Sequence, residues 1–187
     1  MKNLLAFIIL SFASLNISAQ AFKKGDIMLS PGMGLGVYGI GYGVGFAVPV
    51  VLNFDYGVHD YVSVGAYGGF WTKKWNYGFN ESYRFSSSHF GARASFHFWQ
   101  LIDDKVDTDL LSDKLDVYLT PWLGYNLRSA KWIDNGGLTP YNLTWGNRFQ
   151  GGAQIGLRYF INQHFGFFAE WGGTPTSYSN WGFTAKF

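Results

Sequence analysis

The chain has 187 residues, of which 48% are hydrophobic, 20% aromatic and only 14% charged, and its formal net charge is +2. So small a charge gives no electrostatic reason to expect nucleic acid or a strongly acidic partner, and the absence of cysteine excludes a disulfide framework. After residue 20 the chain has no run of roughly 20 apolar residues, which excludes a helical membrane protein as well.

The first twenty residues have the pattern of a secretory signal peptide. Lys2 is followed by an apolar run from Leu4 to Phe12 and then by small and polar residues. We therefore predict a signal peptide at residues 1–20, cleaved near Ala19 or Ala21, and one β-barrel domain at residues 21–187. No cysteine follows the signal, so a lipid-anchored form is excluded.

Eight later stretches alternate apolar and polar residues with a period of two. Each is close to the roughly nine to eleven residues that a tilted membrane strand needs, and an even number suits a closed antiparallel barrel. In the fifth stretch Pro121 lacks a ladder donor, which predicts a bulge or a local break. The stretches are residues 26–38, 46–58, 61–72, 87–99, 115–128, 147–161, 165–172 and 180–187.

The connections between these stretches alternate between short and long. Turns near His59 and Asn162 are short, whereas the segments 73–86, 129–146 and 173–179 are long, and we expect the long ones to face outside. The acidic connection 100–114 departs from this rule. Successive connections alternate between the two sides of the membrane, which places this one in the periplasm, yet it is long. We predict a solvated loop there, with a short helix around residues 108–114. A divalent-cation site is the alternative, although the spacing lacks the glycine and the distal glutamate of a calcium-binding loop.

The last stretch alternates strictly and ends on an aromatic residue, with Trp181, Phe183, Ala185 and Phe187 on one face. With the signal peptide and the eight alternating stretches, this pattern resembles the small eight-stranded outer-membrane β-barrel family of Gram-negative bacteria. The resemblance implies an all-β, up-and-down antiparallel barrel in the outer membrane, monomeric and in contact with outer-membrane lipids. It also implies that Trp181, Phe183 and Phe187 form the C-terminal signal read by the barrel-insertion machinery.

Strand parity places one set of polar residues in the barrel interior. An eight-stranded barrel is only wide enough for its own side chains to fill, so we predict a charge-compensated polar network that plugs the lumen. A narrow porin-like channel or carrier for small molecules is the alternative. The charged members of the set are Asp55, Arg93, Arg158, Glu170 and Lys186, and the neutral ones are Asn53, His89, His97, Gln150 and Gln154.

An interfacial lipid-modifying enzyme is a more distant alternative. Ser87 and His89 share a strand face, but a nucleophilic serine also needs a third group that orients the histidine. The glycine motif from Gly34 to Gly39 is not followed by a helix pattern, so it does not predict a dinucleotide site. We therefore expect no enzyme activity, no catalytic residue, no metal and no cofactor.

The external connections hold the best remaining chance of a specific partner, since recognition usually lies on surface loops. The aromatic residues Trp71, Trp75, Tyr77, Trp171 and Trp181 are interpreted mainly as membrane-interface anchors. We predict a structural or surface-interaction role, with an extracellular ligand bound through the loops. Interrupted strand pairing at Pro49 and Pro121 would instead create a lateral opening for small apolar molecules. The aromatic loop residues are Trp75, Tyr77, Tyr83, Trp132, Tyr141 and Trp145.

Overall fold

The computed structural model describes residues 21–35, 48–77, 81–106, 113–134, 142–144, 146–173 and 177–187. Within these ranges a helix, α2 (Phe98–Val106), follows the fourth strand. The strands are β1 (Ile27–Leu35), β2 (Val50–His59), β3 (Val62–Tyr77), β4 (Glu81–His97), β5 (Leu115–Asp134), β6 (Asn142–Thr144), β7 (Arg148–Phe160), β8 (Phe165–Gly172) and β9 (Ser179–Lys186).

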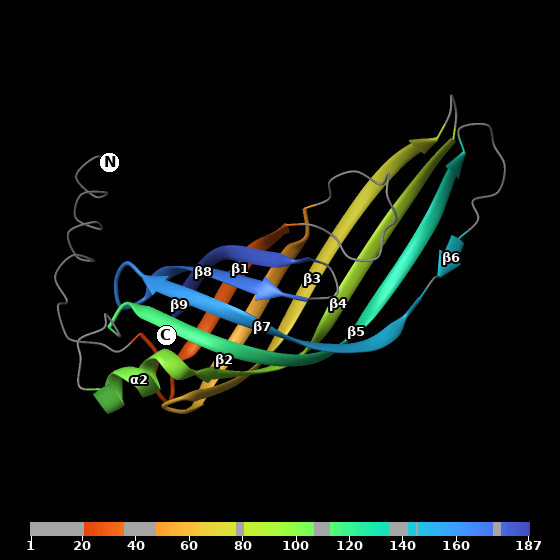
Figure 1. Ribbon diagram of the computed structural model, residues 1–187. Coiled ribbons are helices and arrows are strands. Elements are labelled where there is room, and N and C mark those ends of the chain that lie inside the picture. The colour runs from red at the N-terminus through yellow and green to blue at the C-terminus, as the bar shows by residue number, and fades with distance from the viewer. Residues whose placement is uncertain are drawn as a thin grey trace, which may run out of the picture.

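Eight of these strands form a closed antiparallel barrel (Figure 1). The strand order is a meander, in which β1 pairs with both β2 and β9 and the β4–β5 pairing completes the cylinder. The short strand β6 pairs with β5 at Ser129–Lys131, while β7 pairs with β5 from Leu115 to Asn126. The predicted eight-stranded up-and-down barrel is confirmed, with β6 as an addition to it.

Exposed and buried residues alternate along β2 and over much of the other barrel strands. In β2, Leu52 and Phe54 are exposed while Asn53 and Asp55 are buried. The barrel is therefore polar inside and apolar outside, the reverse of a water-soluble domain. Large apolar side chains exposed on its wall include Ile27, Leu29, Leu52, Phe54, Val64, Phe70, Phe90, Phe96, Leu119, Leu123, Ile155, Phe167 and Phe183.

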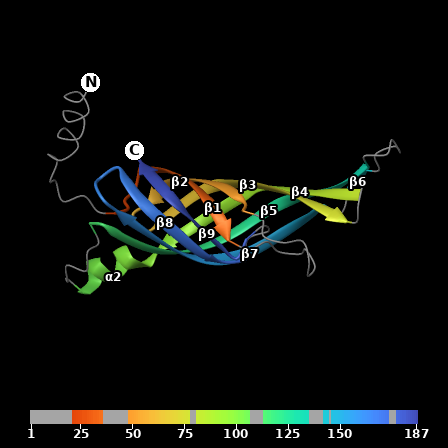
Figure 2. The same cartoon turned by 90° about the horizontal axis from the view of Figure 1, so that it is seen from above.

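Strands β3, β4 and β5 continue beyond the barrel as a three-stranded ribbon at the end opposite α2 (Figures 1 and 2). Their pairing runs without interruption from Phe70↔Ser88 to Tyr77↔Glu81 between β3 and β4. The prediction of loops at 73–86 and 129–146 was therefore wrong for 73–77, 81–86 and 129–134. The aromatic residues of the ribbon, such as Tyr83 and Phe85 of β4, occupy the positions whose parity faces the lumen further along the strand. Their alternation is therefore out of phase with the apolar alternation of the barrel wall, and the sequence pattern of the wall does not continue into the ribbon.

The structure has a helix at residues 98–106, which the sequence analysis did not predict, and residues 113 and 114 of the predicted helix around 108–114 lie in a turn. The strand-like alternation of β4 runs into Phe98, which masked the start of the helix in the sequence. Residues 107–112 lie outside the described part of the chain. Within the described part, no helix is both long enough and apolar enough to cross a membrane.

A hydrogen bond ties α2 to the turn before β3. The Tyr61 hydroxyl donates to Asp104 Oδ2 at 2.7 Å, which raises the pKa of the phenol above its ordinary value of 10. Because the pKa is higher in the folded state, this contribution to stability is complete below pH 10 and is lost as the pH rises through the folded-state pKa. We expect Asp104→Asn to lower the Tyr61 pKa, as measured by NMR of ring-labelled tyrosine. An unchanged titration would contradict the contact.

The barrel wall keeps one register past its prolines. Pro121 pairs with Ala153 of β7, whereas on the β4 side the pairs stop at Arg93↔Trp122 and resume in the same register at Phe96↔Leu119. The predicted local break thus occurs on one side only and without a bulge. Pro49 accepts a hydrogen bond from the Gly34 backbone N–H at 2.8 Å. Neither proline shifts the strand pairing, so the geometry gives no support to a lateral opening at them.

Candidate functional site in the barrel lumen

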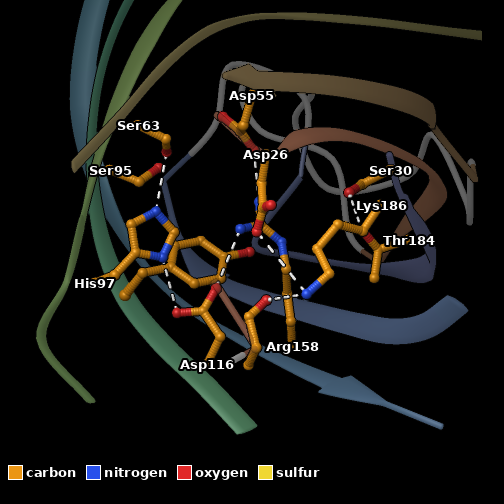
Figure 3. A network of polar contacts seen from close by, with 12 residues as sticks. Asp26, Ser30, Asp55, Ser63, Ser95, His97, Asp116, Arg158, Thr184 and Lys186 are labelled. Carbon is orange, nitrogen blue, oxygen red and sulfur yellow. Dashed lines mark hydrogen bonds and ion pairs between the residues drawn. The ribbon is translucent and has the colours of Figure 1, made fainter. Parts of the chain in front are cut away.

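The centre of the lumen is a cluster of buried charges. Arg93 Nη2 donates to Glu170 Oε1 at 2.6 Å, and its Nε lies 3.0 Å from Asp55 Oδ1. Arg158 bridges two carboxylates, donating from Nη2 to Asp55 and from Nη1 to Asp116 Oδ2 at 3.3 Å (Figure 3). These five side chains come from five different strands, β2, β4, β5, β7 and β8, so their contacts cross the lumen.

Two further residues complete the cluster around Glu170. Tyr118 donates from its hydroxyl to Oε1 at 3.0 Å, and Asn53 donates from Nδ2 to Oε2 at 3.1 Å. The Arg158 guanidinium also lies 4.2 Å from the centre of the Tyr118 ring. Tyr118 has the same parity on β5 as Asp116, so its side chain lies inside the barrel. The sequence pattern treated tyrosine as apolar, and Tyr118 was therefore not included among the polar lumen residues.

A second polar layer lies towards the end of the barrel that carries α2. His97 Nδ1 is 2.8 Å from Asp116 Oδ1, and His97 Nε2 is 3.0 Å from Ser63 Oγ (Figure 3). This has the geometry of a serine–histidine–acid relay. However, Ser63 and His97 have no exposed surface, and the ring of Phe22 stacks on His97 with centroids 3.5 Å apart. The arrangement therefore holds three strands together and leaves no route for a substrate.

The Ser87 hydroxyl, which the sequence analysis considered as a partner of His89, has a different hydrogen-bond partner. The Ser87 hydroxyl donates instead to Asn126 Oδ1 at 2.7 Å, and Asn126 in turn donates to Gln150 at 3.3 Å. His89 is buried and its ring packs edge-on against Tyr67 at 5.6 Å.

The N-terminal segment closes the mouth of the barrel near α2. Lys186 does not join the central cluster; its Nζ donates to the Ala21 carbonyl at 3.2 Å and lies 3.8 Å from Asp26. Ala21, Phe22, Met28 and Phe160 form a buried apolar cluster beside it. The sequence placed Lys186 in the lumen together with Asp55, Arg93, Arg158 and Glu170, and the structure separates it from those four.

The opposite end of the lumen is filled by aromatic side chains. Trp71 and Trp122 are buried, and the Tyr67 ring lies edge-on to Trp122 at 5.7 Å. Trp71 was interpreted as a membrane-interface anchor, which was wrong, whereas Trp171 and Trp181 are exposed on the outer wall. A cavity of about 10 Å³ beneath these rings has room for roughly one water molecule. Its lining includes Asn53, Tyr67, His89, Arg93, Trp122 and Gln154.

The described residues contain no group of three or more histidine, cysteine or acidic side chains placed to hold a metal ion. Asp107 and Asp109 of the acidic connection 100–114, for which a divalent-cation site was the alternative prediction, lie outside those residues. Asp104 of this connection accepts the Tyr61 hydrogen bond.

Comparisons with known proteins agree on the fold. No protein-family model matches the chain, and no curated protein matches it in sequence. The crystal structure of Ail, the attachment invasion locus protein of Yersinia pestis, matches with a TM-score of 0.57 at 13% identity, covering 88% of this chain and 99% of Ail. Ail in complex with the heparin analogue sucrose octasulfate gives a TM-score of 0.58 at the same identity and coverage. The chain therefore has the eight-stranded barrel fold seen in Ail.

Proposed function

We propose that this protein is an integral outer-membrane β-barrel with a side-chain-filled lumen, which acts as a structural and surface-interaction protein and not as a pore or an enzyme. The observation that carries the proposal is the buried ionic cluster. Arg93, Arg158 and their carboxylate partners span the lumen from five strands and are almost completely buried. A solute would have to break these ion pairs in order to pass.

The apolar outer wall supports a membrane location. Its exposed Leu, Val and Phe side chains would be unfavourable in water over so large a surface but suit hydrocarbon. Export through the periplasm with a signal peptide at residues 1–20, and insertion guided by Trp181, Phe183 and Phe187, complete this proposal. The barrel fold shared with Ail is consistent with it.

The ribbon formed by β3, β4 and β5 supports the surface-interaction role. It extends the barrel at the end opposite α2, away from the mouth that the N-terminal segment closes (Figure 1). Ail, which shares the fold, has been crystallised with a heparin analogue. We propose that the ribbon end of this protein binds an extracellular ligand.

Single-channel recording in planar bilayers tests the plugged lumen. The refolded mature protein, shown to be folded by its heat-modifiable migration on a gel, should give no discrete conductance. As a positive control for insertion, a porin is recorded in the same membranes. Reproducible openings from folded protein would overturn the proposal in favour of a narrow channel.

Labelling with a fluorophosphonate tests the enzyme alternative. Because Ser63 is buried under Phe22 and His97, we expect no labelling of the folded protein in detergent or in lipid vesicles. Ser63→Ala should give the same blank result. Labelling that requires Ser63 and disappears in His97→Ala would show an active nucleophile and contradict the assignment.

A further inference from the structure

The outer face of the ribbon carries a row of three cations that crosses three strands. Strand register places Lys74 of β3 directly opposite Arg84 of β4, and Arg84 directly opposite Lys131 of β5. All three residues are exposed. Residues directly opposite each other in an antiparallel pair have Cβ atoms roughly 4.5–5.5 Å apart on one face, so these three positive charges form one compact group.

A row of hydroxyl side chains lies next to the cations, two residues closer to the barrel. It is made of Thr72, Ser86 and Ser129, which are again directly opposite one another. Thr72 and Ser86 are joined by a hydrogen bond of 3.0 Å between their hydroxyl oxygens. Hydroxyl groups beside cations supply the hydrogen-bond donors that a phosphate oxygen accepts.

The same face becomes apolar immediately below the hydroxyl row. Phe70 precedes Thr72 on β3 and Leu127 precedes Ser129 on β5, and both apolar side chains are exposed. These residues belong to the apolar wall, whose exposed side chains continue down the barrel. Each of the two strands therefore passes from apolar to hydroxyl to cationic along its outer face, in the order in which a lipid passes from hydrocarbon to headgroup.

The cation row has no acidic counterpart on its own face within the described residues. Like charges directly opposite each other are destabilising across strands, and no ion pair offsets them among the salt bridges of that part of the chain. The acidic residues at the tip of the ribbon, Glu81 and Asp134, occupy positions of the opposite parity. An anion supplied from outside the chain would offset the repulsion.

We propose that Lys74, Arg84 and Lys131, with the adjacent hydroxyl row, bind the phosphate group of an outer-leaflet lipid headgroup. The inference rests on the proposed membrane location. The position of the row favours a lipid over a soluble polyanion, because it lies on the face that continues the apolar wall and directly beyond the end of that wall. Basic residues near an anionic membrane surface contribute about 1 kcal/mol each. Three of them correspond to roughly 100-fold in affinity.

Native mass spectrometry of the folded protein tests this. Protein from mixed micelles of zwitterionic and phosphatidylglycerol lipids should retain the anionic phospholipid. The K74Q/R84Q/K131Q variant should retain it roughly 100-fold less tightly. A matched control, K24Q/K105Q/K114Q, removes the same charge from exposed positions near α2 and should behave as the unmodified protein. The proposed site would be overturned if the unmodified protein and both variants retained the anionic phospholipid equally. It would also be overturned if both variants lost the phospholipid to the same extent.

Added heparin fragments and inorganic phosphate distinguish the source of the anion. Competition by phosphate alone at low concentration, or a variant defect for heparin with none for phospholipid, would reject the lipid in favour of a soluble anion. The assay needs only folded protein, which the gel-shift control reports. A negative result for lipid binding can thus be told apart from a negative result for the closed barrel, because the closed barrel is tested by single-channel conductance.

Discussion

Replacing Arg158 by methionine should lower the free energy of unfolding by about 3–5 kcal/mol, the typical cost of removing one partner from a buried ion pair. The change leaves Asp55 and Asp116 in the lumen without the guanidinium that they share. It also removes the cation from the face of the Tyr118 ring. Unfolding by urea in lipid vesicles, followed by tryptophan fluorescence, measures the loss.

The control for this experiment is Arg148→Met, which removes an exposed arginine from the same strand, β7. Surface substitutions of this kind usually change stability by less than about 0.5 kcal/mol. If Arg158→Met fails to fold, Arg158→Lys gives a graded second test, because lysine keeps the charge but cannot reach both carboxylates as a fork does. Equal midpoints for the Arg158 and Arg148 variants would show that the ionic cluster does not stabilise the folded barrel.

Gly65→Ala should reduce the free energy of unfolding by about 3 kcal/mol, the upper end of the usual cost of overpacking, or prevent folding, because the overlap is with backbone and cannot be relieved by a side-chain rotation. A Cβ at Gly65 would overlap the carbonyl oxygen of Phe54 and lie 2.8 Å from its carbonyl carbon and 2.9 Å from Asp55 Cα. The clash would push β2 from β3 beside the carboxylate that both arginines contact. Folding yield on a heat-modifiability gel reports the effect.

Gly68→Ala on the same strand is the matched control. Its Cβ would meet nothing closer than the His89 carbonyl oxygen at 3.9 Å, an ordinary contact. The two variants add one methyl group each to β3 but differ in the space available. Similar folding yields for both would contradict the close approach of β2 and β3 at Gly65.

The fold was predictable from the sequence because a barrel strand makes its two faces chemically different. Asp55, Arg93, Arg158 and Glu170 all follow from parity, since each alternates with large apolar residues on its strand. Parity does not say which charges meet, because partners such as Arg93 and Glu170 are far apart in sequence and face each other across the lumen. Closure of the cylinder, and not any local pattern, brings them together.

The ribbon, the helix and the N-terminal closure were missed for a different reason. The aromatic residues of the ribbon, such as Tyr83 and Phe85, are out of phase with the apolar residues of the barrel wall, so the segments that contain Lys74 and Arg84 were taken for loops. Phe22 belongs to no alternating stretch, and its burial depends on contacts with residues as distant as His97. Tyr118 was not predicted as a member of the polar cluster, because its side chain is apolar in the ring and polar only at the hydroxyl that contacts Glu170.

The contact between the two ends of the described barrel has a consequence for how the molecule is assembled. Ile27 and Phe187 exchange backbone hydrogen bonds of 3.1 and 2.9 Å, and Lys186 holds Ala21 at the same place. These partners are separated by almost the whole sequence, so they impose a late and entropically costly ring closure. The pairing of β1 with β9 and the N-terminal closure of the mouth both need the last strand, so a partly synthesised chain that lacks β9 cannot close the barrel.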